Sequence, residues 1–125
     1  MKVVLSIKPE FANKIFDGTK LFEFRKRIFN ESIKSVLVYS SSPVQKVIGE
    51  FQIGEIIKHD LETLWDLTKE YSGISEDYFY EYFADKEHGY AIQIKKKTKF
   101  RIPKCLREDY NLTPPQSFAY WTKPE

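Results

Sequence analysis

Gly18-Thr19-Lys20-Leu21-Phe22-Glu23-Phe24-Arg25 is the stretch from which the fold of this chain is inferred. Side chains alternate between the two faces of a strand, so Glu23 and Arg25 share one face while Phe22 and Phe24 share the other. The aromatic face is suited to a hydrophobic core. The other face brings a carboxylate within reach of two cations, because Lys20 stands at the start of the strand. We therefore expect a strand with one buried face and one charged face.

The residues before this stretch predict an amphipathic helix over 9–17. Pro9 suits the first helical position, where its missing N–H is not needed. Phe11 and Ile15 are four residues apart and lie on one helical face. Gly18 follows as the residue that ends the helix in a left-handed conformation. A strand, a helix and the charged strand thus follow one another with little loop between them.

Further strand and helix patterns fill the rest of the chain. About six strands are expected in all. Helices near 60–71 and 75–84 are expected between two of these strands, and Asp60 and Ser75 are suitable N-caps for them. Gly49 and Gly54 interrupt the long strand that starts at Lys46, as glycines do at bulges and bends of small barrels. The pattern predicts an α+β fold, a small, mostly antiparallel β-barrel decorated by helices near 9–17, 60–71 and 75–84.

Length and composition favour one soluble domain, residues 1–125. No apolar run is long enough to span a membrane, and no signal peptide is recognisable. Cys105 is the single cysteine, which excludes an internal disulfide and fits a reducing compartment. These features predict a cytoplasmic protein without membrane association. His59 and His88 lack partners at metal-ligand spacing, so neither a metal site nor a cofactor is expected.

Charge is distributed unevenly along the chain, although its net value is only +2. Residues 60–87 hold nine acidic residues and two lysines, whereas the rest holds eighteen basic and nine acidic residues. A basic surface can attract phosphate backbones, and the acidic helices could dock a protein partner. The alternative is that both segments are ordinary solvated faces.

The octet at 18–25 matches the pattern G-x-K-x-x-E-x-R, and in this respect the chain resembles the ASCH domain family. Other blocks resemble the same family in the same order: Leu5–Pro9, Val38–Pro43, Val47–Phe51 and Pro114–Phe118. The resemblance covers nearly the whole chain and implies a PUA-like barrel. It also implies a cleft beside the octet that binds RNA or a nucleotide-like ligand.

Some members of this family are enzymes, and the resemblance implies two possible activities. One group removes the acetyl group from N4-acetylcytidine, and ribonuclease activity is ascribed to others. Lys20 matches the catalytic lysine of the first group, but that group has a threonine where this chain has Glu23. Its helical glutamate has only Glu70 and Glu76 as candidates here.

Candidate site residues fall into a central group and an outer group. In the central group, Lys20 and Arg25 could hold a phosphate or a base carbonyl, and Glu23 could accept from a base amino group. In an enzyme, Lys20 and Glu23 would be catalytic, with Glu23 as general acid or base. The alternative is a structural ion-pair network. The outer group contains Ser6, Lys8, Tyr39, Ser40, Ser41, Lys95 and Lys97.

Each part of the outer group also has a structural alternative. Ser6 and Lys8 share a strand face that could simply be solvated. Tyr39 could stack on an unpaired base, with serine hydroxyls beside it, or could be a core residue before a serine turn. Lys95 and Lys97 could follow a phosphate backbone or form a solvated face.

We predict a domain that binds nucleic acid, RNA or a modified nucleotide, in a charged cleft centred on the octet. The first alternative is a metal-independent hydrolase, either a ribonuclease or an enzyme similar to the N4-acetylcytidine amidohydrolases. The second alternative is a protein-interaction domain in transcription or translation.

Overall fold

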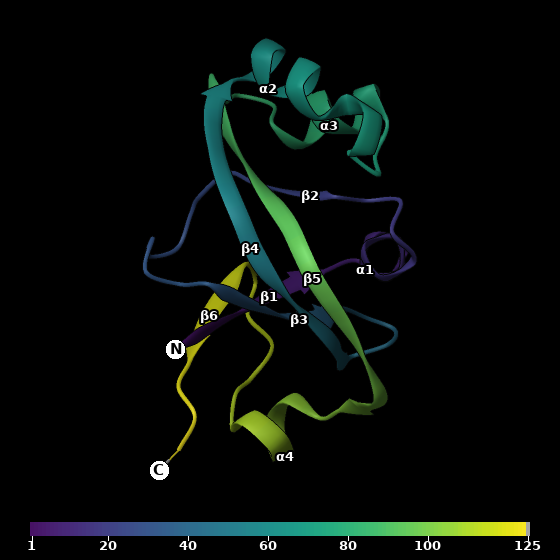
Figure 1. The fold of residues 1–125 in the computed structure, drawn as a ribbon, viewed down its shortest axis with the longest axis vertical. Coiled ribbons are helices and arrows are strands. Elements are labelled where there is room, and N and C mark those ends of the chain that lie inside the picture. The colour runs from purple at the N-terminus through teal and green to yellow at the C-terminus, as the bar shows by residue number, and fades with distance from the viewer. Residues whose placement is uncertain (125) are drawn as a thin grey trace.

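The computed structural model describes residues 1–124 and is built on one six-stranded mixed sheet (Figure 1). Its elements are β1 (Lys2–Ile7), α1 (Pro9–Asp17), β2 (Phe22–Arg25), β3 (Ser35–Ser40), β4 (Lys46–Asp60), α2 (Leu61–Thr68), a 3-10 turn η1 (Lys69–Tyr71), α3 (Glu76–Tyr82), β5 (His88–Lys104), α4 (Leu106–Tyr110) and β6 (Phe118–Trp121). The strands lie in the order β2-β5-β4-β3-β1-β6. β1 and β3 are parallel, and the other neighbouring pairs are antiparallel.

The α+β class and the six strands are confirmed, but the closed barrel is wrong. The sheet remains open, with β2 and β6 as its two edges, and its strand directions are mixed. Side chains rather than a backbone ladder connect the two ends of the sheet. Arg25 on β2 donates to the carbonyls of Ser6 on β1 and of Ser117 just before β6. The sheet is therefore curled enough for its ends to approach each other.

The local signals for helix ends are confirmed. α1 has the expected bounds, and Gly18 ends it with φ of 90°. The helix expected near 60–71 is α2 followed by η1, and Asp60 caps it by accepting from the Thr63 N–H at 3.0 Å. Ser75 caps α3 in the same way. α4 was not predicted, since its five residues are too few to show a helical period.

The long antiparallel pair of β4 and β5 bends through bulges. β4 contains the expected irregularities, at Gly49 and between Ile53 and Ile56. β5 does not end at the lysine run 95–97 but continues to Lys104. Lys96 has φ of 36° at a point where the register with β4 shifts. An extra residue in one strand bends it and leaves the pairing intact on both sides.

Two hydrophobic clusters fix the elements that surround the site. One joins α1 to β1, β3, β4 and β5, with Leu5, Ile15 and Phe51 fully buried. The other lies beneath α2, η1 and α3, which we call the helical cap (residues 61–82), and contains Phe79 and Phe83. Figure 1 shows the helical cap at one end of the antiparallel pair β4 and β5.

Within residues 1–124, no helix has both the length and the apolar character needed to cross a membrane.

Candidate nucleic-acid site

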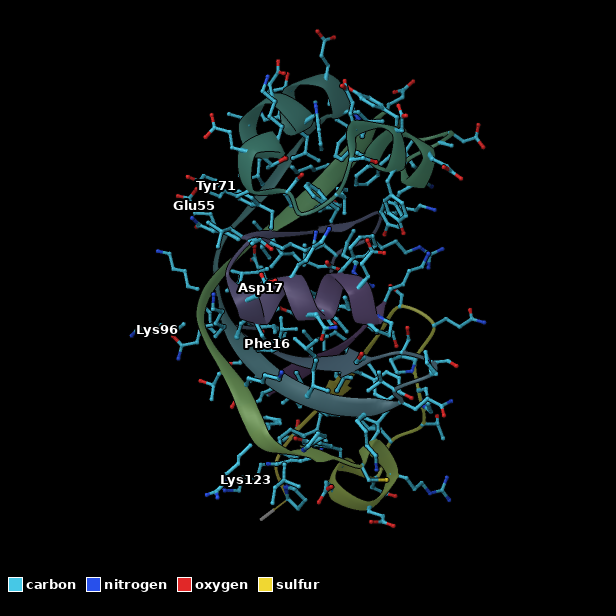
Figure 2. The ribbon with its side chains drawn as sticks, turned by 90° about the vertical axis from the view of Figure 1, so that its right-hand side faces the viewer. Phe16, Asp17, Glu55, Tyr71, Lys96 and Lys123 are labelled. Atoms are coloured by element: carbon cyan, nitrogen blue, oxygen red, sulfur yellow. The ribbon has the colours of Figure 1, made fainter. Side chains whose placement is uncertain are left out.

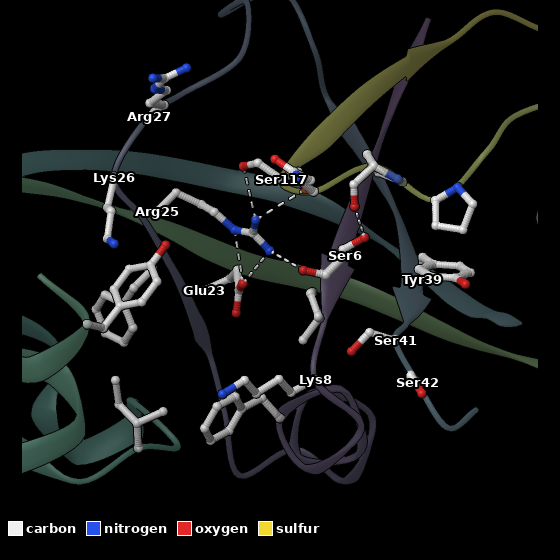
Figure 3. Close-up of a pocket in the computed structure, with 18 of the residues that line it drawn as sticks. Ser6, Lys8, Glu23, Arg25, Lys26, Arg27, Tyr39, Ser41, Ser42 and Ser117 are labelled. Carbon is white, nitrogen blue, oxygen red and sulfur yellow. Dashed lines mark hydrogen bonds and ion pairs between the residues drawn. The ribbon is translucent and has the colours of Figure 1, made fainter. Parts of the chain in front are cut away.

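A pocket of about 780 Å³ opens where the two ends of the sheet approach each other. β1, β2, the end of β3, the start of α1, the helical cap and residues 114–117 contribute to its lining (Figure 3). The lining carries five cationic side chains and one acidic side chain: Lys8, Lys20, Arg25, Lys26, Arg27 and Glu23. This excess of positive charge favours an anionic ligand.

Arg25 lies at the centre of the pocket and is held entirely by protein acceptors. Its Nε and Nη2 donate to Glu23 Oε2 at 3.1 and 2.9 Å, and Nη2 also donates to the Ser6 carbonyl at 2.7 Å. Nη1 donates to the carbonyl and hydroxyl oxygens of Ser117 at 3.3 and 3.4 Å. Figure 3 draws these bonds as dashed lines. A guanidinium has five N–H donors, so this network leaves Arg25 chiefly a positioning role.

Glu23 and Lys20 form the buried floor beside Arg25. Glu23 is 7% exposed, and its second oxygen, Oε1, lies 3.9 Å from Lys20 Nζ. Lys20 is 1% exposed and donates to the Ser72 carbonyl at 2.6 Å. Its Nζ also lies 5.0 Å from the ring centre of Phe24. Burial lowers the pKa of Lys20 to about 8, although the nearby Glu23 carboxylate acts in the opposite direction.

The helical cap is attached to this floor through three consecutive carbonyls, those of residues 71–73. They accept hydrogen bonds from the Leu21 N–H at 2.8 Å, Lys20 Nζ at 2.6 Å and Lys14 Nζ at 3.1 Å. Gly73 has φ of 70°, and a Cβ there would lie 2.6 Å from the Lys20 side chain. Glycine is therefore required both by the backbone conformation and by the close packing on Lys20.

The pocket has two chemically different walls. One wall presents the hydroxyl groups of Ser6, Ser41, Ser42 and Ser117, and a second wall presents Phe11, Phe24, Ile74, Tyr78 and Tyr82. Tyr39 also lines the pocket beside the serines, but it is 4% exposed and packs in a hydrophobic cluster with Val4 and Leu37. In Figure 3, Tyr39, Ser41 and Ser42 lie on the side opposite Lys26 and Arg27. Burial raises the pKa of the Tyr39 hydroxyl above its ordinary value. Such an arrangement can bind both the polar and the flat apolar parts of one ligand.

Most of the predicted site residues are brought together here. Those that line the pocket are Ser6, Lys8, Lys20, Glu23, Arg25, Tyr39 and Ser41. Ser40 is 1% exposed and does not line it. Lys95 and Lys97 are exposed on β5 and also lie outside it. A Cβ at Gly18 would lie 3.0 Å from Lys97 Nζ, which places that amine at the C-terminal end of α1. Figure 2 shows this region, with Asp17 at the end of α1 and Lys96 on β5 labelled.

Several lining residues were missed by sequence reasoning. Lys26 and Arg27 directly follow the octet, and their position beside it was the available signal. Tyr78 and Tyr82 are four residues apart in α3, a spacing that more often marks a core-facing stripe. Tyr82 packs against the cluster beneath the helical cap and also lies under Lys26, whose Nζ is 4.8 Å from the ring centre. Ser117 is part of the Pro114–Phe118 block, which had been used only as a sign of the fold.

Comparison with known proteins now adds to this geometry. No protein-family model matches the chain. The ASCH domain-containing ribonuclease of Zymomonas mobilis is 30% identical over 128 residues, which cover 99% of this chain and 86% of that protein. The chain belongs to the ASCH domain family. This result confirms the family resemblance inferred from the octet and the blocks around it.

Solved structures of the same Zymomonas protein agree with the fold of this ASCH domain. The crystal structure of ASCH from Zymomonas mobilis matches with a TM-score of 0.88 at 32% identity, covering 98% of this chain and 87% of that one. A tyrosine-to-phenylalanine variant matches with a TM-score of 0.88 at 31% identity, covering 98% and 90%. A serine-to-alanine variant matches with a TM-score of 0.87.

Two other relatives are longer proteins of Ureaplasma parvum serovar 3. ATP synthase subunit alpha is 34% identical over 119 residues, which are 94% of this ASCH domain but 15% of the relative. Large ribosomal subunit protein uL22 is 33% identical over 120 residues, 94% of this chain and 38% of the relative. The chain therefore spans less than half of either protein.

Within residues 1–124, no group of three or more His, Cys, Asp or Glu side chains could hold a metal ion.

Proposed function

We propose that this ASCH domain binds single-stranded RNA and takes an unpaired nucleotide into the pocket. The observation that carries the proposal is the combination, in one pocket, of a cationic excess with a hydroxyl wall and an aromatic wall. Sequence-specific RNA recognition uses unstacked bases held against aromatic rings, with cations on the backbone. The relative called an ASCH domain-containing ribonuclease supports RNA as the ligand.

A single strand fits this pocket better than a duplex does. Bases in a duplex are stacked and paired, so their faces cannot reach rings that line a pocket. Lys8 and Lys26 lie beside Tyr78 and Tyr82, with Nζ 5.4 and 4.8 Å from the ring centres. Each aromatic ring therefore has a cation next to it. A base against the ring would leave its phosphate near the amine.

Hydrolysis of the bound RNA is the second candidate function, and the name of the Zymomonas relative favours it. Lys20 and Glu23 remain the proposed catalytic residues at the floor of the pocket. Tyr39 adds a hydroxyl, which is protonated at neutral pH like that of any tyrosine and could donate its proton as a general acid. N4-acetylcytidine deacetylation is not favoured, since Glu70 and Glu76 are exposed and neither lines the pocket.

One experiment tests binding and hydrolysis separately. Fluorescent single-stranded RNA and the same sequence as a duplex are titrated with purified protein by anisotropy, and the samples are then resolved on a denaturing gel. We expect the single strand to bind at least about tenfold more tightly than the duplex, because only its bases can enter the pocket. Equal affinities would contradict the proposed site, and absence of all binding would overturn the function.

Hydrolysis is tested with Tyr39→Phe, with Lys95→Ala as a matched control outside the pocket. We expect Tyr39→Phe to bind RNA with nearly unchanged affinity and to lose cleavage by about 100-fold, in the range of general acid–base catalysis. Lys95→Ala should cleave like the parent protein. Binding without any cleavage by the parent protein would leave a binding module and remove the second candidate.

A further inference from the structure

Glu23 carries a carboxylate oxygen that the fold has left without a hydrogen bond. Oε2 receives both bonds from Arg25, whereas Oε1 accepts none among the described residues. Its nearest cation, Lys20 Nζ, is 3.9 Å away, beyond hydrogen-bond length. The Glu23 side chain is only 9% exposed, and the exposure it retains is toward the pocket that it lines. In Figure 3 this oxygen carries no dashed line and points away from Arg25.

Such an oxygen is an acceptor that is already positioned for a ligand. Arg25 fixes the carboxylate from one side by a fork of two bonds, and Lys20 lies behind the other oxygen. A polar atom without a hydrogen bond in a nearly buried site costs free energy until a ligand donates to it. A hydrogen bond to a charged carboxylate is stronger than one to a neutral acceptor. No fully buried polar side-chain atom among the described residues lacks a partner, so Oε1 retains contact with the pocket.

The surroundings decide which donor of a nucleotide can reach this oxygen. A phosphate is excluded, because two anions would repel each other at contact distance. Lys20 Nζ, which stands behind Oε1, is 5.0 and 5.6 Å from the ring centres of Phe24 and Phe11. Oε1 thus faces the side of Lys20 and its two rings, where a flat base fits, whereas Oε2 faces Arg25, which contacts Ser6 and Ser117.

We propose that Glu23 Oε1 accepts a hydrogen bond from an N–H on the Watson–Crick edge of the bound base. This inference rests on the proposed RNA binding and adds a specificity to it. An N–H on that edge is free only when the base is unpaired, so Glu23 selects unpaired bases. It also rejects bases in which methyl groups replace that hydrogen, since a methyl group would meet the carboxylate without a hydrogen bond.

The test uses trinucleotides of adenosine, cytidine and uridine, each with an ordinary or a donor-blocked central base. The blocked bases are adenine and cytosine with a dimethylated amino group, and 3-methyluracil. For the base that binds best, we expect blocking to weaken binding to the parent protein by about 10- to 100-fold, the range for losing a hydrogen bond to a charged group. Equal affinity for the two forms would overturn the inference while leaving RNA binding itself intact.

The variant Glu23→Gln separates hydrogen bonding from crowding by the methyl groups. We expect the penalty for the blocked base to shrink at least threefold in this variant, while Glu55→Gln, an exposed carboxylate on β4, keeps it unchanged. A penalty that persists in full in Glu23→Gln would mean crowding and would contradict the inference. A trinucleotide with a 2′-deoxy central nucleotide is the last arm. If only this change weakens binding, Glu23 contacts the sugar and the inference is wrong.

Discussion

Replacement of Arg25 by methionine tests whether the centre of the pocket is a structural network. Methionine fills a similar apolar volume but has no charge and no donors. The substitution removes five hydrogen bonds, of which two go to Glu23 on the same strand and three join β2 to Ser6 on β1 and to Ser117. It also removes the closer of the two ion-pair partners of the Glu23 carboxylate, whose side chain is 9% exposed, and leaves only Lys20 Nζ at 3.9 Å.

The expected loss follows from that burial. Removing one partner of a buried ion pair costs about 3–5 kcal/mol. Here the remaining Glu23 charge is compensated only by Lys20, which makes no hydrogen bond to it, so we expect the low end of this range or a little above it. Neither side chain is exposed enough for solvent to reduce this figure much. Replacing both partners removes the uncompensated charge, so the double variant Glu23→Leu with Arg25→Met should regain about half of the loss or more. Ser117 O retains the Ser6 N–H as a donor in both variants.

Urea denaturation followed by circular dichroism measures these free energies of unfolding. With a slope of about 1–3 kcal/mol per molar urea, a loss of about 3–5 kcal/mol moves the midpoint by more than about 1 M. Lys95→Ala, which changes an exposed side chain, should stay within about 0.5 kcal/mol of the parent protein. The network argument is refuted if Arg25→Met costs less than about 1 kcal/mol, or if the double variant is less stable than the single one.

Three further predictions concern the floor, the helical cap and the basic residues. Because the pKa of Lys20 falls from 10.5 to about 8 on folding, the unfolded chain binds more protons between these values, and stability rises with pH there. Relative to Lys20→Met, the parent protein should gain about 3 kcal/mol of unfolding free energy between pH 8 and 10.5, and an unchanged difference would contradict the shift. Gly73→Ala should cost about 1–3 kcal/mol in thermal or urea unfolding, because φ is positive and Lys20 is in the way. Gly54→Ala, whose new Cβ meets the flexible ends of Gln93 and Lys95, should cost less than about 1 kcal/mol; equal losses would refute the backbone argument. In salt titrations of single-stranded RNA binding, Lys8→Ala should reduce the log–log slope by about 0.7, the value for one phosphate contact. Lys95→Ala should leave the slope unchanged, because Lys95 lies outside the pocket, and a reduced slope would support the sequence prediction for the β5 lysines.

Local residue chemistry was enough to predict much of the fold. Pro9 and Gly18 determine the two ends of α1 through backbone geometry that needs no distant partner. The caps at Asp60 and Ser75 act within three residues, so they too could be recognised from sequence. The alternation in the octet correctly separated the charged face of β2 from its aromatic face.

Long-range packing decided what the sequence could not. Whether six strands close into a barrel depends on bends summed over the whole sheet, and here the ends of the sheet meet through Arg25 instead. The same packing determined the role of each charge. Arg25 and Glu23 are adjacent on the strand in any fold of β2, but only contacts with Ser6 and Ser117 satisfy the arginine and leave one carboxylate oxygen free.

The sequence by itself was enough to identify the family, through its motif blocks. It also determined the helix ends and the presence of a charged strand, because these two features depend on interactions between near neighbours. The tertiary structure decided that Tyr78 and Tyr82 line the pocket, that Ser40 is buried, and that Lys95 and Lys97 lie outside it. The physical reason is that a pocket is formed by segments far apart in the chain. Their relative positions depend on how the curled sheet and the helical cap pack together.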